Sequence, residues 1–180
     1  MKTRTTVIKK LKTWLTALFY GQGFTTEKRA TEMDNIERFN VLAGVTFSLL
    51  YESFPIPRNL DLSQDYECKD VVQKAIRRVV LSGPEQDKVD FIYATVRWLR
   101  QTGYIAFEEE RKFPLGFKGV ILTAKGLEVL NAVPTTLTEK PAGLFLKEAV
   151  KAGIFKSITD GVQFVLAKGV QCVPAILNTF

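Results

Sequence analysis

Four polar side chains near the end of one predicted helix have the hydrogen-bonding chemistry that nucleic-acid recognition needs. The helix is predicted from about residue 84 to residue 101, and one half of its surface carries all four. Arginine pairs bidentately with guanine, glutamine with adenine, and tyrosine with phosphate. The candidate nucleic-acid-binding residues on this helix are Tyr93, Arg97, Arg100 and Gln101.

The segment after this helix predicts a β-hairpin with more cations. Tyr104–Phe107 alternates like a strand, residues 108–116 read as a charged turn, and Phe117–Leu122 reads as the returning strand. Arg111 and Lys112 in the turn are further candidate phosphate contacts.

Acidic residues oppose this chemistry. The helix begins with Glu85, Asp87 and Asp90, and the turn opens with three consecutive glutamates at 108–110. Each neutralised phosphate needs a cation, so an acidic approach weakens nucleic-acid binding. This balance favours protein interaction at least as much as DNA binding for the central segment.

The formal net charge of +6 is concentrated at the two ends of the chain. Residues 1–34 hold seven Lys/Arg and three Asp/Glu, residues 35–122 hold twelve of each, and residues 123–180 hold six and four. Lys9, Lys10 and Lys12 near the N-terminus are therefore additional candidates for reaching phosphates.

Enzymatic chemistry finds little support. The chain has no histidine, and its two cysteines, Cys68 and Cys172, are too far apart in sequence for the usual zinc-site spacing. The glycine-rich phosphate-binding, dinucleotide-binding and nucleophile motifs are also missing from the sequence. We therefore expect a non-enzymatic cytoplasmic protein with no metal and no cofactor. We favour two buried, reduced thiols, and a single disulfide between Cys68 and Cys172 is the alternative.

Residues 1–24 predict a basic amphipathic arm. One face is apolar at helical spacing, whereas its lysines stand off that face. A signal peptide is disfavoured because the apolar run is short and lacks a small-residue cleavage pattern. Binding to an anionic membrane remains an alternative, but we favour packing on the domain or on another subunit. The candidate interface residues of the arm are Leu11, Trp14 and Leu18.

Residues 25–133 predict one domain that opens with a long helix. Asp34 and Glu37 form a capping-box-like start, and Pro55 ends the helix. A short strand at Leu60–Leu62, a second helix at about 63–82 and the helix at 84–101 follow, with Gly103 as a left-handed stop. The half of the third helix expected to face the core carries Val89, Phe91, Ile92, Thr95, Val96, Trp98 and Leu99.

The run G-Y-I-A-F…V-I-L-T-A-K-G-L-E-V-L resembles the ending of winged helix-turn-helix proteins of bacterial or phage type. The resemblance covers about residues 34–133 and concerns the fold. It implies that the third helix would enter a DNA major groove and the wing would contact the backbone. It also implies that N-terminal helical extensions act as dimer arms. The expected fold class is mainly α (α+β), with terminal amphipathic helices.

After a linker at 134–141, residues 142–180 predict one helix with a seam of small residues. Glycine inside a helix costs about 1 kcal/mol relative to alanine, so regularly spaced glycines suggest close approach of another helix. We favour self-association in water; docking on the winged helix and membrane insertion stay open. The apolar run is too short to span a membrane and contains Lys168. The candidate oligomer-interface residues are Ala149, Gly153, Ser157, Gly161, Val165 and Gly169.

These patterns predict an interaction or regulatory protein that forms homo-oligomers through its terminal helices and contacts a protein partner or nucleic acid. The alternatives are a DNA-binding transcription regulator and an effector that binds anionic membranes through its amphipathic ends.

Overall fold

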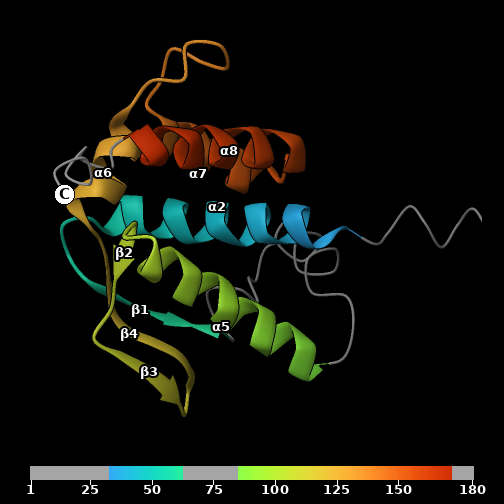
Figure 1. Cartoon of the computed structure of the whole chain (residues 1–180), viewed down its shortest axis with the longest axis vertical. Coiled ribbons are helices and arrows are strands. Elements are labelled where there is room, and N and C mark those ends of the chain that lie inside the picture. Colours follow the sequence, from blue (N-terminus) through green and yellow to red (C-terminus); the bar gives the residue numbers. More distant parts are fainter. Residues whose placement is uncertain (1–32, 63–84, 172–180) are drawn as a thin grey trace, which may run out of the picture. The chain divides into compact units, whose positions relative to one another are not determined.

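A computed structural model describes residues 33–62 and 85–171 (Figure 1). Within these ranges the chain is α+β, with five helices and a four-stranded antiparallel sheet. The N-terminal arm and the helix predicted at 63–82 lie outside the described residues. In chain order the elements are α2 (Asn35–Ser53), β1 (Arg58–Asp61), α5 (Glu85–Gln101), β2 (Ile105–Ala106), β3 (Glu109–Lys112), β4 (Leu115–Leu122), α6 (Ala124–Asn131), α7 (Ala142–Ala152) and α8 (Phe155–Gln171).

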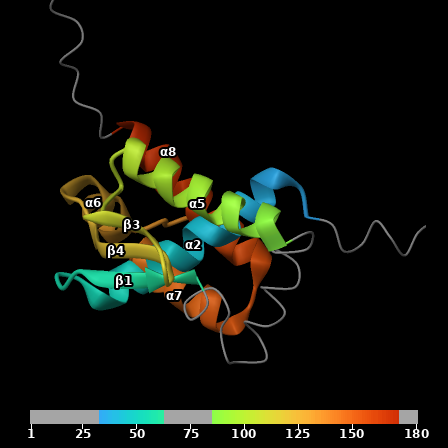
Figure 2. The ribbon, with the colours of Figure 1, turned by 90° about the horizontal axis from the view of Figure 1, so that it is seen from below.

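Helix α2 is the centre of the fold. It begins as predicted, because the Asp34 carboxylate accepts a hydrogen bond from the Glu37 amide at 2.8 Å. Residues 40–48 are buried on every side. Helices α7 and α8 cover one side of α2, while α5 and the sheet lie on the other (Figures 1 and 2). A helix in this position needs apolar or small residues all round, as its sequence supplies.

Strand β4 is the middle of the sheet. Strand β1 pairs with one edge of it, with Leu60 opposite Phe117. Strands β2 and β3 pair antiparallel with the other edge. The predicted turn over residues 108–116 was therefore too long, because Glu109–Lys112 pairs with Leu115–Lys118 and leaves only Phe113 and Pro114 between the strands. This strand was hidden in the sequence because all four of its residues, Glu109–Lys112, are charged and show no apolar alternation.

The C-terminal segment forms two helices instead of the single helix predicted. Gly153 ends α7 in the left-handed conformation, with φ of 65°, and its amide donates to the carbonyls of Ala149 and Val150. Glycine adopts this conformation at no steric cost. The spacing of small residues did not reveal that one of them ends a helix.

Candidate functional site

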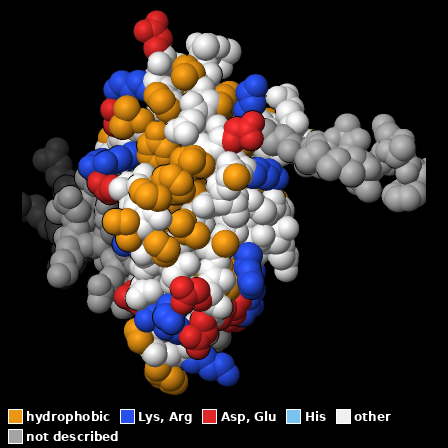
Figure 3. All heavy atoms as spheres, turned by 90° about the vertical axis from the view of Figure 1, so that its left-hand side faces the viewer, with side chains coloured by type: hydrophobic (Ala, Val, Ile, Leu, Met, Phe, Trp, Pro, Cys, Tyr) orange, Lys and Arg blue, Asp and Glu red, His pale blue; other side chains and the backbone are white. Residues whose placement is uncertain are grey.

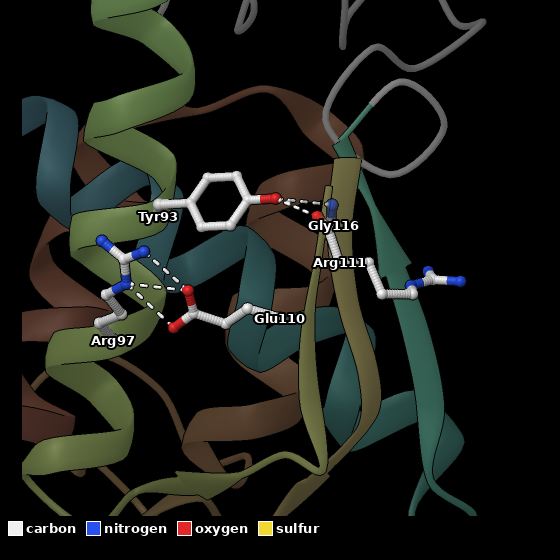
Figure 4. A network of polar contacts seen from close by, with 5 residues as sticks. All are labelled: Tyr93, Arg97, Glu110, Arg111 and Gly116. Atoms are coloured by element: carbon white, nitrogen blue, oxygen red, sulfur yellow. Dashed lines mark hydrogen bonds and ion pairs between the residues drawn. The ribbon is translucent and has the colours of Figure 1, made fainter. Parts of the chain in front are cut away.

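Tyr93 is inside the fold, in a polar cluster between α5 and the β3–β4 hairpin (Figure 4). Its hydroxyl donates to the carbonyl of Arg111 at 2.6 Å and accepts from the amide of Gly116 at 3.0 Å. Periodicity placed Tyr93 on the polar half of α5. The β3–β4 hairpin covers the part of this polar half where Tyr93 lies. Its hydroxyl therefore links helix to hairpin, and a phosphate could not reach it without moving the hairpin.

Arg97 forms a bidentate ion pair with Glu110. Arg97 Nε lies 2.9 Å from Glu110 Oε1, and Nη2 lies 2.7 Å from Oε2. These hydrogen bonds raise the pKa of Arg97 and lower the pKa of Glu110. The guanidinium side chain remains 52% exposed, but its bidentate face is already directed at a carboxylate. A guanine base would have to displace Glu110 to use it.

The other candidate nucleic-acid-binding residues near the hairpin lie in three different environments: an ion pair, a contact with an aromatic ring, and the exposed surface. Arg111 Nη2 pairs with Asp61 at 2.5 Å, and its buried Nε has no hydrogen-bond partner within the described part of the chain. The guanidinium of Arg100 lies 4.4 Å above the centre of the Phe107 ring. Gln101 and Lys112 are exposed. The hairpin therefore does not present a concentrated basic surface.

The charge of the described residues also argues against a basic surface. Residues 33–62 and 85–171 contain 14 Lys/Arg and 14 Asp/Glu, so their formal charge is zero. The whole +6 belongs to the other segments, among them the one with Lys9, Lys10 and Lys12, which lie outside the described residues. Long-range attraction of phosphate by the described body is correspondingly small.

The candidate interface in the C-terminal segment packs within the chain. Ala149, Val165 and Gly169 are buried. A β-carbon added at Gly161 would lie 2.8 Å from Leu146 Cδ2 of α7, and one added at Gly169 would meet the Tyr104 hydroxyl. The close approach predicted from small residues therefore occurs within one chain, with α7 at Gly161 and with Tyr104 at Gly169. Gly153 ends α7, and Ser157 is half-buried. Leu11, Trp14 and Leu18 lie outside the described residues.

A groove that the sequence did not predict lies between α2, α5 and α8. Phe91 and Trp98 were expected in the core, yet Phe91 is half-buried and Trp98 is 39% exposed. The unusually broad apolar half of α5 was the signal, since a helix on a single core needs a narrower stripe. The groove measures about 580 Å³ and is lined by Asn35, Ile36, Phe39, Asn40, Phe91, Ala94, Thr95, Trp98, Gln163 and Leu166.

A separate apolar surface lies on the side shown in Figure 3. Hydrophobic side chains form a band there, with a further cluster at the lower end. The α2–β1 connection and α6 run along this side of Figure 1, and the β3–β4 turn lies at its lower end. The exposed apolar residues here are Phe54 and Ile56 in the α2–β1 connection, Val133 just after α6, Phe113 in the β3–β4 turn and Leu115 at the start of β4. Phe113 is 94% exposed, which is unusual for so large an apolar side chain.

Comparison of the chain with protein-family models, with curated proteins and with solved structures finds no match. Among the described residues, no helix is both long and apolar enough to cross a membrane. In the same residues, no group of three or more histidine, cysteine or acidic side chains is arranged to hold a metal ion.

Proposed function

We propose that this protein is a non-enzymatic interaction and regulatory protein built on a winged-helix core, and that it binds a second protein chain through the apolar side seen in Figure 3. A second copy of the same chain is the first partner to consider. In this proposal the α5–hairpin surface is a rigid support for the apolar side, and DNA contact is secondary.

The order of elements supports the winged-helix part of the proposal. A helix (α2) is followed by a short strand that pairs with the last strand of the sheet, and α5 leads directly into the antiparallel strands β2, β3 and β4. This is the connectivity that the sequence resemblance implies. The helix that should lie between β1 and α5 falls in residues that the structure does not describe.

The observation that carries the proposal is the exposure of large apolar side chains on one side of an electrically neutral body. Ile56 is 71% exposed and Phe113 94% exposed. Large apolar side chains gathered on one exposed side of a domain usually mark a protein contact. Because the cations near α5 are engaged with Glu110, Asp61 and the Phe107 ring, nucleic acid has less to bind on the described residues.

Sedimentation velocity of the full chain over a concentration series tests this proposal. We expect reversible self-association that Ile56→Lys and Phe113→Lys each weaken, because a lysine would have to be desolvated in an apolar contact. Ile154→Lys is the matched control: Ile154 is 52% exposed and lies at the α7–α8 turn, on the other side of Figure 1. A monomer at all concentrations, or equal effects of all three variants, would contradict the proposal.

A gel-shift series over salt concentration measures the nucleic-acid alternative independently. If the +6 charge outside the described body binds DNA, retardation appears at about 50 mM salt and is lost steeply as salt rises. Arg97→Gln should leave that retardation nearly unchanged, since Arg97 is paired with Glu110. A strong loss of affinity in Arg97→Gln would instead favour a DNA-reading α5.

A further inference from the structure

The groove between α2, α5 and α8 has a rigid aromatic wall. Phe39 of α2 and Trp98 of α5 meet edge to face, with ring centres 5.0 Å apart and planes at 86°. Trp98 also stacks on Tyr104 at 6.4 Å, and Arg38 lies 4.3 Å over the Phe91 ring. Residues of all three helices line this space. Because Trp98 packs against Phe39 and Tyr104, and Phe91 packs against Arg38, the exposed faces of these rings form an ordered surface.

One buried polar group opens onto this apolar space. Asn40 is only 3% exposed and lines the groove. Within the described residues its side-chain amide makes no hydrogen bond to another residue. The other buried hydroxyls near it are satisfied; Thr95, for example, donates to the carbonyl of Phe91 at 2.9 Å. Since the Asn40 amide is not among the buried polar atoms that lack a partner, its atoms are accessible from the groove that Asn40 lines, where water or a ligand can hydrogen-bond to them.

The lining carries no charged side chain, which decides the kind of occupant. All ten lining residues are neutral. An ionised ligand would lose its hydration there without gaining a counter-charge. The volume of about 580 Å³ falls within the range of small-molecule sites, which are apolar with a few placed polar groups.

We propose that this groove binds a small uncharged ligand with a flat ring system and one hydrogen-bonding group directed at Asn40. The ring system lies against Phe39, Phe91 and Trp98, and the polar group meets the Asn40 amide. This site is separate from the apolar side proposed for protein contact and does not depend on it.

N-phenyl-1-naphthylamine is a suitable probe, because it is neutral, has a fused ring system and has one N–H group. Its anionic analogue 1-anilinonaphthalene-8-sulfonate has the same rings plus a sulfonate. With the full chain we expect saturable emission enhancement by the neutral probe at one site per chain. We expect the anionic probe to bind at least about tenfold more weakly, a difference of about 1.4 kcal/mol. Equal affinities, or enhancement that does not saturate, would overturn the proposal.

Four variants locate the site. Ala94→Trp should abolish binding by filling the groove from an exposed position, so its fold should be unaffected by circular dichroism. Asn40→Leu keeps the volume and should weaken binding by roughly 2–10-fold, the value of one hydrogen bond. Trp14→Phe leaves Trp98 as the sole tryptophan, whose emission the probe should quench. Leu137→Ala, an exposed apolar position in the connection between α6 and α7, should leave probe binding unchanged. Undiminished binding in Ala94→Trp, or a loss in Leu137→Ala, would show that the probe binds elsewhere.

Discussion

Two regions of this protein lie on opposite sides of the central helix α2 and are held by different contacts. On one side, α7 and α8 pack on α2 through apolar and small residues, and Gly44 lets α8 approach so closely that a β-carbon there would lie 2.5 Å from Ile158. On the other side, α5 and the hairpin are linked by the hydrogen bonds of Tyr93 and the ion pair of Arg97 with Glu110. The first region depends on close packing, whereas the second adds polar links between α5 and the hairpin to its buried apolar residues.

This difference predicts how each region responds to change. In a close-packed interior, adding or removing one side-chain group changes the free energy of unfolding strongly, whereas pH and salt change it little. Exposed polar links respond weakly to substitution and are sensitive to pH and ionic strength. The four predictions below test this contrast, from the largest expected effect to the smallest.

Leu146→Ala should have the largest effect. Leu146 is fully buried in α7, where its side chain faces Gly161 of α8 and Gly44 of α2. Truncating it removes buried apolar contacts and leaves a cavity, so the free energy of unfolding should fall by about 2–5 kcal/mol in urea titration. Leu144→Ala, in the same helix but 37% exposed, is the control and should cost much less. Similar losses in both variants would contradict the packing of α7 on α2.

Gly44→Ala should destabilise the fold although alanine is the better helix former. Propensity alone would raise stability by about 1 kcal/mol. Because the new methyl group would meet Ile158 Cγ2 at 2.5 Å, overpacking should instead cost about 1–3 kcal/mol. In the Gly44→Ala/Ile158→Ala double variant the methyl group has room, so the loss should be smaller than the sum of the single losses. Additive losses would show that α8 does not approach α2 here.

Tyr93→Phe should lower the free energy of unfolding by about 1–3 kcal/mol, because the Gly116 amide loses its acceptor in a buried position. The change hardly alters volume, so urea titration reports the hydroxyl alone. Tyr51→Phe provides the comparison in the other region, where the hydroxyl bonds Asn131 at an exposed position, 3.2 Å away. Tyr51→Phe should lower the free energy of unfolding by less than Tyr93→Phe does. A decrease equal to or larger than that of Tyr93→Phe would contradict the contrast between the two regions.

Glu110→Gln should have the smallest effect, and one that depends on pH. The hydrogen bond from Arg97 lowers the pKa of Glu110 below its usual value of 4.5, so the ionised carboxylate favours the folded state. The stability it contributes is present above about pH 4.5 and is lost as pH falls through the lowered folded-state pKa. Since both side chains are partly exposed, the difference from wild type at neutral pH should be below about 1 kcal/mol.

Urea titrations of wild type and Glu110→Gln at several pH values measure that difference. Comparing the two proteins cancels the similar titration of Glu52, whose pKa is lowered by Lys147. Glu109→Gln serves as the control because Glu109 is an exposed neighbour on the same strand. A difference between wild type and Glu110→Gln that persists unchanged in acid would rule out the ion pair as its source.

The sequence by itself determined where elements begin and end in much of the described chain. The cap at Asp34, the stop before Pro55 and the left-handed turn at Gly103 with φ of 78° were all predicted and are confirmed. These signals are local, because a cap or a turn depends on residues within about four positions of one another. The α+β class followed from the same local patterns.

Only the tertiary structure decided which neighbour covers each face. Periodicity indicated that Tyr93 and Trp98 lie on opposite halves of α5, but the hairpin buries Tyr93 and the gap between α5 and α8 leaves Trp98 at the groove. The small residues of the C-terminal segment indicated close approach without naming the partner, which is α7 at Gly161 and Tyr104 at Gly169, both in the same chain. The periodicity of residues along one helix shows whether a face is apolar or polar. Which segment packs against that face depends on residues far away in the sequence.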